Sequence, residues 1–393
     1  MCSQTHLLRL SSPPQSSRRL CAQDNHDGKI LAVSRSRCVL QPDDMGLHPQ
    51  TSEDPANAPI LGSGIAPFFP VTSRPAGIYL PIHVFLFFFK LPFLFTVSTA
   101  YFLFLQWFPL GSLFKKAILW MMLGIPGIWW IDLQIDGVKK GSLAKKHEGR
   151  VPEPSNIIAS SFTSPIDSLY LAAIFDPIFT VSYPQTRKVQ RISLFGAIFR
   201  ALQKPQEHPP KNAKMTDLAT LLIQHPQRVI VVFPECTTTN GQGILPFSPS
   251  LLTAPSGTKI FPISLRYSPP DITTPVPGAY ISFLWNLLSQ PTHCIRVRIA
   301  EVVYNISNPP VSSEKRDPKY LKNVLETLID DSARTSSTDT LLSISDTEET
   351  TPEERWVLDK VGEALARLGR VKRVGLTAKD KAAFIEAWGK KKS

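Results

Sequence analysis

The chain has 393 residues, 43 % of them hydrophobic, so it can bury a substantial core, and a wholly disordered protein is excluded. The net charge of +11 indicates an anionic partner. Because the sequence has no zinc-finger spacing and no single basic recognition helix, a membrane is a better candidate than nucleic acid. Scattered cysteines without a CxxC pair, and histidines without paired ligand spacing, predict neither a disulfide framework nor a metal site.

The N-terminal part divides into a tail and an apolar segment. Residues 1–58 follow no helical or strand period, which is typical of a disordered tail. A membrane-anchoring segment is expected at residues 59–135, with a first hydrophobic helix at about 79–110 that is long enough to cross a bilayer. Phenylalanines on all its faces argue against a core helix, and Lys90 is expected to extend its long stem to the lipid headgroups.

A second apolar run covers residues 117–131. It contains Pro126 and Gly127 and is short for a span, so a helix in the membrane interface and the return arm of a hairpin both stay open. Lys115 and Lys116 follow the first run, and this basic bias places the rest of the chain in the cytosol.

Short β-rich runs then alternate with helical patterns, which predicts an α/β domain at residues 136–310, a mixed sheet flanked by helices. The expected strands are Trp129–Asp136, Asn156–Ser160, Phe179–Tyr183, Arg228–Phe233, Lys259–Tyr267 and Cys294–Val303. The expected helices are Ile166–Phe175, Ile192–Leu202, Met215–Gln224 and Ala279–Leu288. In the C-terminal region, 311–393, we expect a disordered acidic insert at 331–352 and then a basic helical tail.

The strand Arg228–Phe233 ends abruptly at a proline and leads into a loop of small and hydroxyl residues. The loop residues are Pro234, Glu235, Cys236, Thr237, Thr238, Thr239, Asn240 and Gly241. Backbone amides beyond a strand end, with threonine hydroxyls, can hold phosphate oxygens, and Glu235 can accept hydrogen bonds from loop amides or a substrate hydroxyl. On the residues alone, an ordinary strand and turn is the commoner interpretation.

The nonapeptide FPECTTTNG, Phe233–Gly241, resembles FPEGTTTNG, a form of the third motif of the glycerol-phosphate and lysophospholipid acyltransferase superfamily. The exception is Cys236, where the motif has glycine, a residue often chosen for positive φ. The resemblance implies that residues 136–310 form an acyltransferase-like domain and that this loop binds substrate.

The first motif of that superfamily is a histidine followed, after four residues, by an aspartate. In SNIIASSFTSPIDSLYL, Asp167 stands at the aspartate position and Phe162 at the histidine position. In the family the histidine is the general base for the acceptor hydroxyl, and the aspartate orients it. Three interpretations stay open: a pseudoenzyme that kept its binding site, an enzyme in which Glu235 or Asp167 acts through water as a weaker base, and a motif variant proper to its branch.

Two further segments resemble motifs of the superfamily more weakly, and a larger part of the chain resembles one of its branches. LFGAIFRAL is similar to the second motif and offers Arg200 for an acceptor phosphate, although a surface charge explains it equally well, and IFPISLRY supplies Pro262 of the fourth motif. Residues from about 60 to 393 also resemble a fungal branch of lysophosphatidic acid:oleoyl-CoA acyltransferases linked to vacuolar protein sorting. The GSGIAPFFP stretch, Gly62–Pro70, and the lysine-rich C-terminal helix carry this resemblance, which favours a branch variant of the first motif.

The resemblance implies acyl transfer from acyl-CoA to lysophosphatidic acid, which yields phosphatidic acid. Asp167 and Glu235 are then the catalytic candidates; the substrate-binding candidates are Pro234, Cys236, Thr237, Thr238, Thr239, Asn240, Gly241, Arg200 and Pro262. It implies no metal and no cofactor besides acyl-CoA as co-substrate, a membrane and a lysophospholipid as partners, and no nucleic acid. The expected location is the endoplasmic reticulum membrane or a lipid droplet, with the domain facing the cytosol. The alternative, motivated by Phe162 and Cys236, is a weak or inactive acyltransferase-like protein that acts in lipid binding or vacuolar trafficking.

Overall fold

The computed structural model describes residues 66–71, 77–105, 111–138, 149–306 and 350–392. All of them belong to one compact unit of the chain. The predicted disordered tail, residues 1–58, lies outside the described residues, as does the predicted acidic insert up to residue 349.

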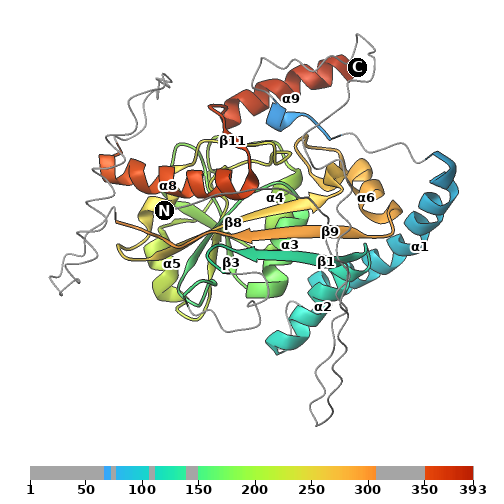
Figure 1. The fold of residues 1–393 in the computed structure, drawn as a ribbon, viewed down its shortest axis with the longest axis horizontal. Coiled ribbons are helices and arrows are strands. Elements are labelled where there is room, and N and C mark those ends of the chain that lie inside the picture. The colour runs from blue at the N-terminus through green and yellow to red at the C-terminus, as the bar shows by residue number, and fades with distance from the viewer. Residues whose placement is uncertain (1–65, 72–76, 106–110, 139–148, 307–349, 393) are drawn as a thin grey trace, which may run out of the picture. The chain divides into compact units, whose positions relative to one another are not determined.

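A nine-stranded mixed sheet forms the centre of the described chain (Figure 1). Its spatial order is β1 (Ile128–Ile135), β9 (His293–Ile299), β8 (Lys259–Ser268), β2 (Ile157–Ser160), β6 (Ile230–Val232), β3 (Ile178–Val181), β4 (Val189–Ile192) and β5 (Met215–Thr216); β10 (Val303–Tyr304) pairs with β8. The central strands β8, β2, β6 and β3 run parallel, while β9 and β4 are antiparallel to their neighbours β8 and β3. The two innermost strands are buried on both faces, which explains their unbroken apolar sequences.

Helices cover both faces of this sheet. They are α3 (Pro165–Phe175), α4 (Leu194–Leu202), α5 (Leu218–Gln224), α6 (Tyr280–Ser289) and α8 (Pro352–Gly369); the last helix, α9 (Ala378–Lys392), contacts Phe69 and Thr237 instead. Because successive strand residues face opposite sides, Ile158 joins a core with α3 and α4, whereas Ile157 joins a second core with α5 and α8. The predicted mixed sheet flanked by helices is therefore confirmed.

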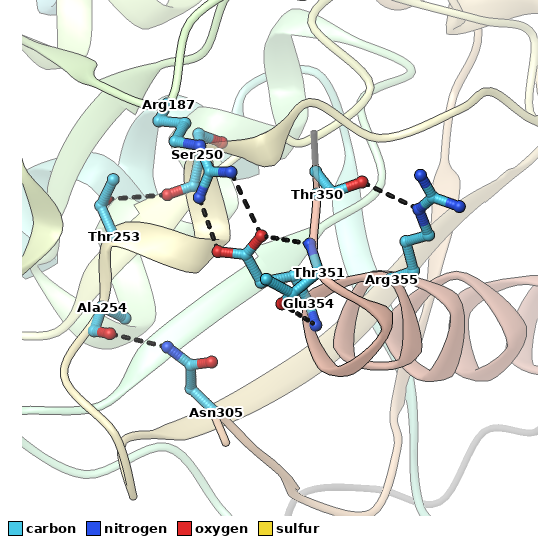
Figure 2. A network of polar contacts seen from close by, with 9 residues as sticks. All are labelled: Arg187, Ser250, Thr253, Ala254, Asn305, Thr350, Thr351, Glu354 and Arg355. Atoms are coloured by element: carbon cyan, nitrogen blue, oxygen red, sulfur yellow. Dashed lines mark hydrogen bonds and ion pairs between the residues drawn. The ribbon is translucent and has the colours of Figure 1, made fainter. Parts of the chain in front are cut away.

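The helix α8 is fastened to the domain at its N-terminus (Figure 2). Thr351 and Glu354 form a capping box, and the guanidinium of Arg187 donates to both carboxylate oxygens of Glu354, at 2.6 and 3.1 Å. The strand β11 (Lys372–Arg373), which follows α8, pairs with β7 (Gly243–Ile244). Strand β7 follows the loop that carries the third-motif resemblance, residues 234–241, which we call the motif loop. The C-terminal region is thus part of the domain that carries the predicted site.

Most predicted elements occur at the expected places, and the differences have local causes. The predicted helix Met215–Gln224 begins only at Leu218, because Met215 and Thr216 pair with β4 as an edge strand. The predicted strand Cys294–Val303 is divided into β9 and β10, which pair with different parts of β8: β9 with residues 263–268 and β10 with Lys259 and Ile260.

The first apolar run forms α1 (Leu80–Thr99), which continues as the π-helix η4 (Ala100–Leu105). Among the described residues, Gly77–Phe104 is the one helix that is long and apolar enough to cross a membrane. One side of α1 packs against α6, and its other side leaves a row of phenylalanines open to the surroundings: Phe85, Phe88, Phe89, Phe93 and Phe95.

Two expectations for this segment are wrong. The ammonium of Lys90 does not extend away from the domain; it donates to the carbonyls of Gln290 at 2.7 Å and Pro126 at 3.0 Å, oxygens that the turns around it leave free. A helix across 117–131 does not form either: α2 (Ser112–Gly124) ends early and β1 starts at Ile128. The turn between them needs Gly127, whose φ is 98° and where a Cβ would lie 2.3 Å from a backbone oxygen. The buried residues of α2 belong to the protein core, so a second membrane helix is not confirmed.

Candidate functional site

Asp167 lies at the start of α3, directly beyond the end of β2. Ser164 caps the helix, and the Asp167 carboxylate closes the capping box by accepting hydrogen bonds from the Thr163 and Ser164 amides, at 2.6 and 2.9 Å. The Thr163 hydroxyl donates to the same oxygen at 3.2 Å, and the Tyr267 hydroxyl from β8 donates to the other. Both carboxylate oxygens are therefore occupied within the chain.

The environment of Asp167 is fully buried. Burial raises the pKa of Asp167 to about 6, while the hydrogen bonds from Tyr267, Thr163 and Ser164 oppose the rise. The same burial and the adjacent carboxylate raise the pKa of Tyr267 well above its usual value, so the phenol stays protonated and remains the donor. This arrangement stabilises the helix start and leaves Asp167 little capacity to accept another proton donor.

Phe162 fills the place where the superfamily has its histidine. The ring is 2 % exposed and stacks on Phe233, the last residue before the motif loop, with centroids 4.4 Å apart. Both rings line a small pocket of about 10 Å³, room for roughly one water, together with Arg200 and Cys236. An apolar stack therefore replaces an ionisable group at the centre of the site.

The loop after β6 folds tightly on itself. Cys236 has a φ of 60°, in the left-handed region that favours the glycine of the family motif. The amides of Cys236, Thr237 and Thr239 donate to the carbonyls of Phe233, Glu235 and Phe162, respectively. Because these amides are used within the chain, the predicted phosphate-holding role of the loop stays a prediction.

Glu235 is the buried carboxyl of this loop that keeps an oxygen free. One oxygen accepts from the Leu245 amide at 3.1 Å, and Oε1 has no hydrogen-bond partner among the described residues. Burial raises the pKa of Glu235 to about 8; the Leu245 and Phe162 amides and the ammonium of Lys381 oppose the rise, and Asp167 adds to it. The Phe162 amide lowers the pKa of this carboxyl, although it does not form a hydrogen bond with Oε1. An unpaired carboxyl oxygen therefore lies beside the position of the missing histidine.

The predicted substrate residues are partly brought together. Thr237, Thr238 and Thr239 are buried beside Glu235. Arg200 on α4 lies near Cys236, with its guanidinium carbon 5.5 Å from the Tyr183 ring centroid, and one of its nitrogens has no hydrogen-bond partner in the part of the chain that the structure describes. Pro262 is not in this cluster: it pairs with Ala159 inside the sheet, and its carbonyl accepts from the Ala300 amide.

The C-terminal end of the motif loop contacts residues 66–71, which we call the N-terminal segment. The side-chain amide of Asn240 donates to the carbonyls of Ala66 and Phe69, at 2.8 and 3.0 Å, and its backbone amide donates to Pro67. Gly241 has a φ of 76° and accepts a hydrogen bond from Arg266 at 2.8 Å. The described part of the stretch that resembles the fungal branch, residues 66–70, thus contacts the motif loop.

Sequence reasoning missed two side chains of the site, Tyr267 and Lys381. Tyr267 follows Pro262 in β8 with the alternation of the strand, and this alternation could have placed it on the face of Ile263 and Leu265. Lys381 lies in α9, and no local signal in the sequence connects it with the loop. Its Nζ donates to the Thr237 hydroxyl at 2.9 Å and to the Thr238 carbonyl at 2.5 Å. Among the described residues, no group of three or more His, Cys, Asp or Glu side chains could hold a metal ion.

Comparison with known proteins agrees with this geometry. Residues 144–266 match the model of the acyltransferase family, a span that includes both Phe162–Asp167 and the motif loop and ends before α8 and α9. The chain is 24 % identical over 336 residues to the "Putative lysophosphatidic acid:oleoyl-CoA acyltransferase" of Schizosaccharomyces pombe, which covers 84 % of this chain and 96 % of that protein. It is 28 % identical over 231 residues to "Lysophospholipid acyltransferase LPEAT1" of Arabidopsis thaliana, covering 52 % of this chain and about half, 54 %, of that relative. The resemblance that the motifs indicated is confirmed.

Proposed function

The chain carries a domain of the acyltransferase family, and from this premise we propose that it transfers the acyl group of acyl-CoA to the free hydroxyl of lysophosphatidic acid, which yields phosphatidic acid. The name of the relative from Schizosaccharomyces pombe supports this donor and acceptor. We further place the protein at the endoplasmic reticulum membrane or lipid droplets, with the domain on the cytosolic side.

The observation that carries the proposal is the unpaired oxygen of Glu235, buried beside Phe162. In this reaction the acceptor hydroxyl loses a proton as its oxygen bonds to the thioester carbon; the carbon–sulfur bond breaks, and the CoA sulfur leaves as the thiol. Glu235 takes that proton and returns it to the sulfur. A carboxyl with a pKa of about 8 is a stronger base than an ordinary glutamate, which suits this role near neutral pH. Asp167 is a positioning residue here, because both its oxygens already accept hydrogen bonds.

The acyl chains of both substrates match the apolar surface near the site. The ring of Phe102 in η4 packs against that of Phe195 in α4, with centroids 5.2 Å apart, and the ring of Phe195 packs against that of Phe199, with centroids 4.8 Å apart. Ala201, near the end of α4, accepts hydrogen bonds from Thr274 at 3.2 Å and Thr238 at 3.5 Å. Helix α4 therefore runs from the apolar surface of the η4 segment to the motif loop, a path along which a lipid tail can stay in an apolar environment.

Acyl transfer in microsomes that contain the protein tests this function, with lysophosphatidic acid and oleoyl-CoA as substrates. The Glu235→Gln variant is expected to lose about 10²-fold or more of the rate, the cost of removing a general base. Glu301→Gln, at an exposed carboxyl of the same domain, serves as the matched control and should retain the full rate. Product no greater than in control membranes would exclude the enzyme, and full activity of Glu235→Gln would exclude the base.

The Phe162–Phe233 stack supports a second candidate, a lipid-binding protein without turnover. That candidate predicts saturable retention of lysophosphatidic acid by the purified protein, with no phosphatidic acid formed from oleoyl-CoA. Formation of product by the same preparation would exclude it.

A further inference from the structure

Lys381 is a fully buried lysine that reaches the motif loop from the C-terminal helix α9. Its ammonium donates to the hydroxyl of Thr237 at 2.9 Å, and to the carbonyl and hydroxyl of Thr238 at 2.5 and 3.0 Å. All three acceptors are uncharged. Since burial of a charge is costly unless it is compensated, a lysine in this place requires an explanation beyond helix packing.

Glu235 belongs to the same loop, two residues before Thr237. The two groups act on each other electrostatically: the ammonium lowers the pKa of Glu235, and the carboxyl raises the pKa of Lys381. Burial opposes both effects and lowers the pKa of Lys381 to about 7, so both groups titrate near neutral pH. A cation beside a base changes how readily that base is ionised, which helix packing alone would not do.

The position of Lys381 is fixed by contacts on both sides of the residue. Thr377 and Asp380 bond at the start of α9, where the Thr377 amide donates to the carboxylate at 2.7 Å. One helical turn after Lys381, Phe384 packs on Phe69 with ring centroids 5.3 Å apart, and Trp388 lies 6.0 Å from the same ring. Figure 1 shows the blue N-terminal segment beside the red α9. These contacts hold the ammonium in the site without any ligand.

We propose that Lys381 is a positioning residue for acyl transfer, which holds Thr237 and Thr238 in place beside Glu235 and favours the ionised form of that carboxyl, the form that accepts the proton. This inference rests on the proposed function, in which Glu235 is the base. It makes the C-terminal helix, which lies outside the family match, a part of the catalytic site.

The test uses the full chain in microsomes and the variants Lys381→Gln and Lys379→Gln. Glutamine can still donate hydrogen bonds but carries no charge, and Lys379 is an exposed lysine on the same turn, so it is the matched control. Without the ammonium the Glu235 carboxyl is harder to ionise, so the rising limb of the pH–rate profile should move about one pH unit upward, with about tenfold lower activity at neutral pH. Lys379→Gln should follow the wild type. A profile unchanged in Lys381→Gln would overturn the proposal.

Thermal unfolding of the detergent-solubilised protein separates this inference from the proposed function. The change in Tm that Lys381→Gln causes between pH 6 and pH 9 should differ between the wild-type and Glu235→Gln backgrounds, because the two groups interact. Equal changes in both backgrounds would overturn the proposal, whether or not the protein transfers acyl groups. If Lys381→Gln alone does not accumulate, recovery in the double variant Lys381→Gln/Glu235→Gln supports the pairing, and failure of both overturns it.

Discussion

The exchange of histidine for phenylalanine at position 162 changes the roles of the residues around it. With no imidazole to orient, Asp167 takes part in the capping box of α3 and accepts the hydroxyl of Tyr267. The phenylalanine ring gains a stacked partner in Phe233. The remaining group with proton-accepting capacity is Glu235, two residues beyond Phe233. The first motif with Phe162 is thus part of an arrangement of five side chains: Phe162, Asp167, Phe233, Glu235 and Tyr267.

Restoring histidine at position 162 is expected not to restore the family mechanism. The Phe162→His imidazole would lose the stack on Phe233 and meet an Asp167 whose oxygens are already occupied. We expect a loss of about 1–3 kcal/mol in the free energy of unfolding and no gain in acyl-transfer rate. Chemical denaturation and the microsomal assay measure the two quantities.

The matched double variant is Phe162→His/Tyr267→Phe, in which the hydroxyl that occupies Asp167 is removed. It should transfer acyl groups faster than Phe162→His alone, because the carboxylate becomes available to the new imidazole. If Phe162→His alone exceeds the wild-type rate, the hydrogen bond of Tyr267 does not block Asp167, and Asp167 is the orienting residue after all.

Individual residues show clearly how far the sequence predicts this site. Asp167 and Glu235 could be located because each follows a strand end within a recognisable local motif. Lys381 and Tyr267 could not, because their roles depend on which distant segments of the sequence the fold brings together. Lys381 contacts Thr237 from the C-terminal helix α9, and Tyr267 contacts Asp167 from β8. The same limit applies to Pro262, whose motif position is in the sheet and not in the cluster.

At the scale of elements, the docking of α8 decides whether the C-terminal region stays with the domain. Its apolar side joins the second core through Val357 and Val361, and its N-terminus is held by the Arg187–Glu354 pair (Figure 2). Burial by itself raises the pKa of Glu354, but the hydrogen bonds from Arg187 and Thr351 outweigh it and lower the pKa below its usual value. The stabilisation from this pair is therefore complete above the unfolded-state pKa of 4.5 and is lost as pH falls through the lower folded-state pKa.

Glu354→Gln is expected to lower the free energy of unfolding by about 1–3 kcal/mol at neutral pH, since it removes a charge-assisted bidentate hydrogen bond. The difference from the wild type should shrink below pH 4.5, where the wild-type carboxyl also becomes protonated. Thermal melts across acidic and neutral pH measure it, with Glu363→Gln on the exposed side of α8 as the control. A difference that persists unchanged at acidic pH would show that the ion pair is not its cause.

Elements were predictable where one pattern dominated. Buried apolar runs predicted β2 and β6. The capping boxes of Ser164 and Thr351, which the structure shows at the starts of α3 and α8, are a local signal that could have located both helix starts. The apolar run 117–131 was misjudged because its hydrophobic residues continue from the end of α2 into the start of β1, and hydrophobicity alone does not mark the boundary between a helix and a strand. Only the tertiary contact of Gly127 with the turn at Pro291 shows where α2 gives way to β1.

At the scale of the whole molecule, the exposed apolar surface of the described residues is concentrated on α1 and the helices α2 and α6. Exposed large apolar side chains occur along α1, at the start of α2 and on α6, including Leu113 at 82 % and Ile281 at 81 % exposure. Helix α1 packs on α6, and the amine of Lys90 bonds to carbonyls next to both α6 and β1. A large exposed apolar surface fixed to a folded domain is typical of a membrane contact. Under the proposed function, such a contact would hold the site at the lipid surface that carries the lysophospholipid.

The proposed membrane contact predicts the effect of charges on the outer side of α1. The variant Phe88→Asp/Phe93→Asp places two carboxylates at side chains that are 66 % and 54 % exposed, so the fold should be unaffected. Each carboxylate costs about 2.5–3.5 kcal/mol in the apolar part of a bilayer, in addition to the lost phenylalanine. We expect the variant to leave the membrane fraction in a high-salt wash that retains the wild type. The control is Ile223→Asp, which charges an equally open position, 79 % exposed, on α5. Retention of both variants would mean that α1 does not hold the protein, whereas release of both would mean that any added negative charge weakens an electrostatic attachment of this basic chain.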